Sequence, residues 1–112
     1  MTAAGYDSYP PAQRISEMLG IKQSDLAKLV GVSRNALVKK SGTRKVDQAL
    51  NPVLSILNMA TEMAGNEGQA AIWFKHQPIP GWAGKTAYDL VGEGQSGKVL
   101  AYLEAARAGI YA

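Results

Sequence analysis

Apolar residues recur every three or four positions through most of this sequence, a spacing that is typical of amphipathic helices. In the first such segment, Ile15, Met18 and Leu19 share one helical face, two consecutive prolines open the helix, and Gly20 ends it. The same spacing predicts helices in residues 23–40 (two short ones), 51–64, 66–76, 86–92 and 95–108. No segment alternates convincingly between apolar and polar residues, so we expect an all-α fold.

Residues 23–40 have the pattern of a helix-turn-helix, in which two short helices meet at Gly31. Glycine adopts the left-handed conformation that ends a helix without steric strain, and Ser33 is a favoured N-cap for the helix that follows. Ala27 is small enough for the two helices to cross closely. The apolar seam between them is formed by Leu26, Val30, Val32 and Leu37. Lys40 departs from the pattern, because such motifs usually bury an aliphatic residue there.

The exposed face of the second helix carries side chains suited to DNA. Arginine pairs with guanine, asparagine pairs with adenine, and lysine neutralises phosphate. The loop at 41–45 adds basic residues that either approach a phosphate backbone or are simply solvated. The predicted DNA-binding residues are Ser33, Arg34, Asn35, Val38, Lys39, Arg44 and Lys45. The alternative is a helical hairpin that only packs against the rest of the chain.

Asn51 and Pro52 form a typical helix start, with a capping side chain followed by proline at the first helical position. The helix from 51 to 64 carries two apolar stripes. One comprises Val53, Leu54, Leu57 and Ala60, and the other comprises Ile56, Met59 and Met63. Either both stripes are buried in one core, or the second packs against another copy in a homodimer. We therefore divide the chain into a helix-turn-helix region at 10–46 and a second helical domain at 51–112.

Charge is distributed unevenly along the 112 residues. Residues 1–50 contain eight Lys/Arg against four Asp/Glu, whereas residues 51–112 contain four against five. A basic excess in the helix-turn-helix half is expected of a nucleic-acid-binding region, although an ordinary solvated surface would also explain it. The N-terminus has no signal-peptide pattern, and the apolar stretch at 52–64 is too short to span a bilayer. We expect a cytoplasmic protein.

The sequence shows no arrangement of residues that is typical of a catalytic or metal site. The chain has no cysteine and one histidine, His76, which we interpret as a helix-terminal residue and not as a catalyst or metal ligand. The segment 92–98 is glycine-rich and contains Lys98, but it lacks the spacing of a phosphate-binding loop and is better explained as a turn between helices. We therefore predict no enzymatic activity and no cofactor.

The C-terminal half resembles the toxin-binding domain of the Xre/MbcA/ParS antitoxins of bacterial type II toxin–antitoxin systems. The resemblance is carried by the segments at 71–73, 83–86 and 89–91, by Gly97, Val99 and Leu103, and by the ending Ala108-Gly109-Ile110-Tyr111-Ala112. The N-terminal half is similar to the Xre-type helix-turn-helix of the same proteins. The chain departs from the family at Ala87, where proline is usual.

The resemblance implies a function. Members of this family pair with RES-domain toxins, which degrade NAD, and cover the toxin's active site while repressing the shared operon. The expected partners are therefore a RES-domain toxin and operator DNA. The expected toxin-binding residues are Trp82, Lys85, Gly109, Ile110, Tyr111 and Ala112.

Two alternatives concern the tail and the loop at 77–85. Tyr111 offers a rigid apolar ring with a polar tip, as interface anchors often do. The tail therefore either plugs a pocket in the partner or folds onto its own core against Trp82, which is itself either an interface anchor or a core residue. Two other functions stay open: a stand-alone transcription regulator whose C-terminal half dimerises or senses a ligand, and a protein-binding module that has lost DNA binding.

Overall fold

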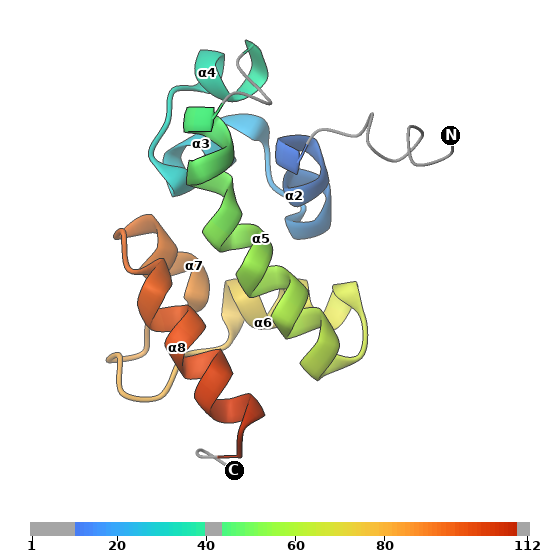
Figure 1. Cartoon of the computed structure of the whole chain (residues 1–112), viewed down its shortest axis with the longest axis vertical. Helices are drawn as coiled ribbons and strands as arrows, with labels where there is room; N and C mark the ends of the chain where they lie inside the picture. Colours follow the sequence, from blue (N-terminus) through green and yellow to red (C-terminus); the bar gives the residue numbers. More distant parts are fainter. Residues whose placement is uncertain (1–10, 40–43, 110–112) are drawn as a thin grey trace.

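The computed structural model describes residues 11–39 and 44–109, with the side chains of residues 38 and 39 left out. In these ranges the chain is all-α, as predicted, and the elements follow each other as seven helices (Figure 1). They are α2 (Pro11–Leu19), α3 (Gln23–Val30), α4 (Arg34–Lys39), α5 (Arg44–Ala64), α6 (Glu67–His76), α7 (Ala87–Gly92) and α8 (Ser96–Arg107). None of the helices in the described ranges is long and apolar enough to cross a membrane.

Local capping signals explain most of the helix boundaries. The Asn66 side chain accepts a hydrogen bond from the Gln69 N–H at the start of α6. Thr86 and Asp89 form a reciprocal capping box at the start of α7, in which each side chain accepts a hydrogen bond from the other residue's backbone N–H. The predictions for these two helices, for α2 and for α8 are confirmed within one or two residues at each end.

The start of α5 was predicted incorrectly. The helix begins at Arg44, runs through Asn51 and contains Pro52 in its interior. Proline removes one backbone hydrogen bond from a helix, which normally costs about 3 kcal/mol. Packing offsets this cost, because Val46 and Leu50 before the proline and Val53 after it are all buried in the same core. The predicted loop at 41–45 is therefore helical from Arg44 onwards, and its earlier residues lie outside the described part.

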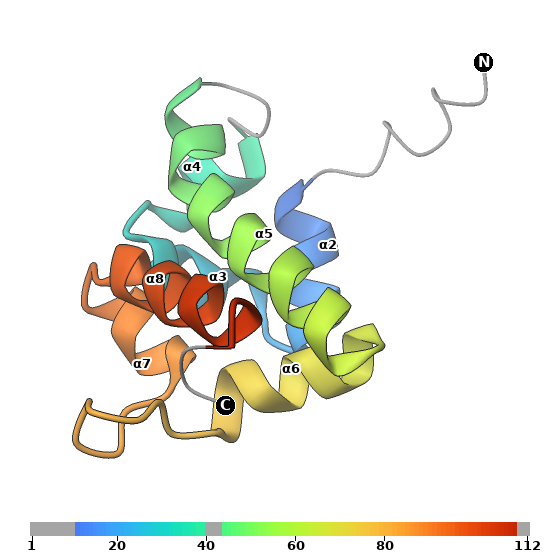
Figure 2. The same ribbon diagram turned by 60° about the horizontal axis from the view of Figure 1, so that its bottom comes forward.

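Helix α5 is the central element of the fold. It extends from the neighbourhood of α4 to the neighbourhood of α6, with α8 alongside it (Figures 1 and 2). One cluster of buried side chains joins residues from α2, α3, α4, α5, α6, α7 and α8. The boundary drawn from the sequence, between residues 46 and 51, falls within this continuous helix and its shared core.

Both apolar stripes predicted on α5 are covered mainly by the chain itself. Ile56, at the centre of the second stripe, is fully buried, and Met59 packs against the core. Met63, the last residue of that stripe, is 43 % exposed. The observation that motivated a homodimer is thus largely explained by intramolecular packing, and the homodimer stays a prediction.

Candidate DNA-binding and partner-binding surfaces

Helices α3 and α4 meet at a sharp turn whose geometry follows from two residues. Gly31 has φ +78°, in the left-handed region that glycine favours, and its N–H donates to the carbonyl of Ala27. Ser33 then accepts a 3.0 Å hydrogen bond through Oγ from the N–H of Ala36, which caps α4. The turn and the cap lie where the sequence predicted them.

Helix α4 packs against α3 through one face. Leu37 is 1 % exposed and Ala36 is half-buried against the core, while Leu26 and Ala27 supply the facing side of α3. The opposite face of α4 is open, and both Arg34 and Asn35 are exposed. Among its described side chains, α4 therefore buries Leu37 and presents Arg34 and Asn35 outward.

The predicted DNA-binding residues gather at one end of the molecule. Helix α4 and the first turn of α5, which carries the exposed Arg44 and Lys45, lie next to each other at this end (Figure 1). Ser33, Arg34 and Asn35, at the start of α4, are exposed as well. The side chains of Val38 and Lys39, and the whole of Lys40, lie outside the described part.

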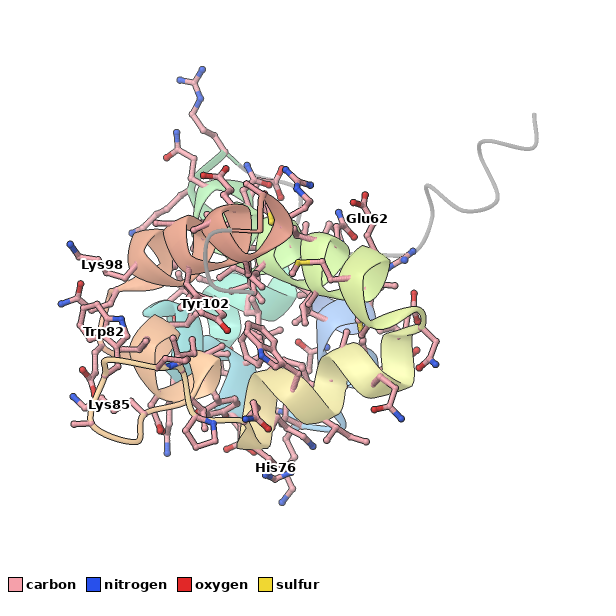
Figure 3. All side chains as sticks on the ribbon, turned by 90° about the horizontal axis from the view of Figure 1, so that it is seen from below. Glu62, His76, Trp82, Lys85, Lys98 and Tyr102 are labelled. Carbon is pink, nitrogen blue, oxygen red and sulfur yellow. The ribbon has the colours of Figure 1, made fainter. Side chains whose placement is uncertain are left out.

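The predicted toxin-binding residues Trp82 and Lys85 lie on the loop between α6 and α7 (Figure 3). Ile79 anchors this loop in the core at 1 % exposure, and its N–H donates to the carbonyl of Lys85 at 2.8 Å. The Lys85 N–H donates in turn to the carbonyl of Trp82 at 3.0 Å. Because these backbone bonds and the left-handed φ values at Gly81, Ala83 and Gly84 fix the loop, it presents its side chains in one defined arrangement.

Trp82 and Lys85 are each partly exposed in the structure. Trp82 is half-buried and packs against the core, with part of its ring accessible. Lys85 is also partly exposed, and its Nζ forms a 2.8 Å ion pair with Oε1 of Glu93. Gly109 follows α8 with φ +87°, whereas Ile110, Tyr111 and Ala112 lie outside the described residues. The end of α8 and the loop both lie in the half of the molecule away from α4 (Figure 1).

An apolar groove beside the end of α8 was not predicted from the sequence. It has a volume of about 440 Å³, which is the size of a small ligand pocket. Its lining residues are Ala60, Met63 and Ala64 of α5, Gln69 and Trp73 of α6, and Tyr102, Leu103 and Ala106 of α8. In Figure 3, Tyr102 projects from α8 into the interior of this end of the molecule. No local sequence pattern marks the groove, because its lining comes from three separate helices, with alanines on α5 and α8 and the aromatic residues Trp73 and Tyr102 on α6 and α8.

His76 and the glycine-rich segment at 92–98 both lie at helix ends. His76 is exposed at the last residue of α6, where a helix-terminal residue was expected. The glycine-rich segment forms the turn between α7 and α8, with Gly94 in the left-handed region, as predicted. Within residues 11–39 and 44–109, no three His, Asp or Glu side chains gather in a way that would hold a metal ion.

The chain matches no protein-family model, and no curated protein or solved structure is significantly similar to it. The resemblance to the Xre/MbcA/ParS antitoxins therefore rests on the sequence motifs alone.

Proposed function

We propose that this protein is an antitoxin that binds operator DNA through α4 and covers the active site of a RES-domain toxin with its C-terminal region. The observation that supports the proposal best is the presence of two separate surfaces toward opposite ends of the molecule. One consists of Arg34, Asn35, Arg44 and Lys45, and the other combines the loop at 77–85 with the end of α8 (Figure 1). The protein acts through these surfaces and catalyses no reaction.

The DNA-binding part is supported by charge as well as by shape. The N-terminal end of a helix carries a partial positive charge, so cationic side chains are unfavourable there and anions are favourable. Arg44 and Lys45 nevertheless occupy the first turn of α5, together with Asp47. A DNA phosphate beside this turn would be attracted by both cations and by the helix end. Arg34 and Asn35, exposed on α4, are the residues suited to read bases.

The toxin-binding part is supported by the loop and by the chain that follows Gly109. The loop offers an aromatic ring and an ammonium group from a fixed backbone, at Trp82 and Lys85. Such rigid aromatic and cationic groups are typical anchors of protein interfaces. Ile110 and Tyr111, which follow Gly109 in the sequence, are apolar side chains that suit a pocket in the partner.

Co-expression with the RES-domain toxin of an adjacent gene tests the proposal. The full chain should restore growth and co-purify with the toxin, and a chain that ends at Ala108 should release toxin activity. The truncated chain should keep its helical circular-dichroism spectrum and its affinity for the upstream DNA. Full neutralisation by the truncated chain would contradict the proposed role of the tail.

A gel shift with the upstream region of the protein's own gene tests the DNA-binding part. Retarded DNA without any neighbouring toxin gene would favour the alternative of a stand-alone transcription regulator, for which the apolar groove provides a ligand-sized space. Toxin binding without retarded DNA would leave a protein-binding module whose helix-turn-helix has lost its function.

A further inference from the structure

Helix α8 ends in a cap formed by Ala108 and Gly109. The N–H of Gly109 donates to the carbonyl of Ala106 at 3.0 Å, and the N–H of Ala108 donates to the carbonyl of Glu104 at 3.1 Å. Together with the left-handed φ of Gly109, the first of these bonds is the pattern of a Schellman cap. In such caps the residue after the glycine commonly makes an apolar contact with the last turns of the helix. The described part of the chain therefore ends in a cap of the kind that returns the following residue to its own helix.

The groove begins at the same turn. Ala106, whose carbonyl accepts the bond from Gly109, is also one of the residues that line the groove, next to Leu103 and Tyr102. Three residues follow Gly109, and an extended chain of three residues spans about 10 Å. The tail therefore starts at the rim of the groove and is long enough to enter it.

The chemistry of the tail and the groove also match. The groove is lined chiefly by apolar atoms, and Trp73 and Met63 contribute large surfaces that the body of the protein leaves partly open. Two of the three tail residues, Ile110 and Tyr111, are large and apolar. Gln69 adds an amide at the groove that is able to bond a phenol or a terminal carboxylate.

From these observations we propose that the groove between α5, α6 and α8 is the docking site of the chain's own tail, Ile110, Tyr111 and Ala112. A tethered tail has an effective concentration in the millimolar range, so it outcompetes the tail of a second copy at ordinary protein concentrations. The docking takes place in the protein without a partner. Its consequence rests on the proposed function: the toxin must then withdraw the tail from this groove, so that the groove and the toxin's active site compete for residues 110–112.

Tryptophan fluorescence of the free protein tests the docking. Trp73 lines the groove, and a Trp82→Phe background removes the other tryptophan of the chain. Removing residues 110–112 from this variant should shift the Trp73 emission to longer wavelength and increase its quenching by acrylamide. The Gly109 cap is retained, and an unchanged circular-dichroism spectrum controls for folding. An identical emission spectrum and identical quenching before and after the truncation would overturn the proposal.

A groove-filling substitution provides a second readout. Ala106→Met should displace the tail, so that carboxypeptidase releases Tyr111 faster than from the parent chain. Ala101→Met is the matched control, because Ala101 is exposed on α8 and does not line the groove. Equal release from all three chains would contradict the docking. A Trp73 signal that changes with protein concentration would also contradict it, because the occupant would then be a second copy. Neither experiment contains toxin or DNA, so neither depends on the proposed function.

Discussion

The end of the molecule at α4 and the end formed by α5, α6 and α8 are built in different ways. Helix α4 has six residues; Leu37 is its buried side chain among those described, and the Ser33 side chain caps its start. The other end is made of longer helices that share fully buried side chains such as Ile56 and Phe74. The contrast shows that one end depends on local hydrogen bonds and exposed charge, whereas the other depends on burial. At the α4 end, substitution of an exposed side chain should therefore weaken DNA binding without lowering the free energy of unfolding. At the end formed by α5, α6 and α8, substitution of a buried side chain should lower the free energy of unfolding.

Phe74→Ala should have the largest effect. The ring is fully buried and meets the ring of Tyr88 edge-on, with centroids 6.0 Å apart. Truncation of a buried phenylalanine should lower the free energy of unfolding by about 3–5 kcal/mol, as measured by urea denaturation. Ile72→Ala is the control, because Ile72 lies on the same helix and is 55 % exposed. Its effect should stay within about 0.5 kcal/mol, and equal effects would refute the assignment of the core.

Arg34→Ala should affect binding without affecting stability. An arginine that reads a base contributes about 1–3 kcal/mol to affinity, so fluorescence anisotropy at fixed salt should show weaker binding to the upstream DNA. Arg107→Ala, at the opposite end of the chain, should leave this affinity nearly unchanged (Figure 1). Comparable losses in the two variants would mean that the DNA contact is not localised at α4.

Ser33→Ala should have a smaller effect on stability. It removes the acceptor of the 3.0 Å bond from the Ala36 N–H and should lower the free energy of unfolding by about 1 kcal/mol. Ser33→Asp should restore most of the loss, since aspartate is an equally good cap. Ser55→Ala on the exposed face of α5 is the control and should change little. A loss of stability that Ser33→Asp does not recover would point to a role other than capping.

The smallest expected effect concerns pH. Burial, and after it the negative charge of Asp25, raises the pKa of Tyr88 above its ordinary value of 10.0. The folded state therefore favours the neutral phenol, and this contribution to stability is complete below about pH 10 and is lost as the pH rises through the raised pKa. Thermal unfolding between pH 8 and pH 11 should show a steeper alkaline decline in the parent than in Tyr88→Phe. Parallel declines would exclude this tyrosine as the cause.

Local signals predicted much of the fold. The Gly31 and Ser33 turn and the Thr86 start of α7 each depend on one side chain or one backbone conformation, and each has the predicted position. Exposure of Arg34 and Asn35 followed from helical periodicity for the same reason. The start of α5 was missed because Asn51 and Pro52 form a local start signal that packing on both sides of the proline overrides.

By itself, the sequence determined the helical class, most helix ends and the positions of the exposed basic residues, because hydrogen bonds within a few residues and the 3.6-residue period set these features. Only the tertiary structure decided that α5 joins both halves in one core, that its second apolar stripe is mostly covered, and that a groove lies beside Ala106. These features depend on how side chains from distant segments fill the space between helices, and the volumes left between them are not encoded in any local pattern.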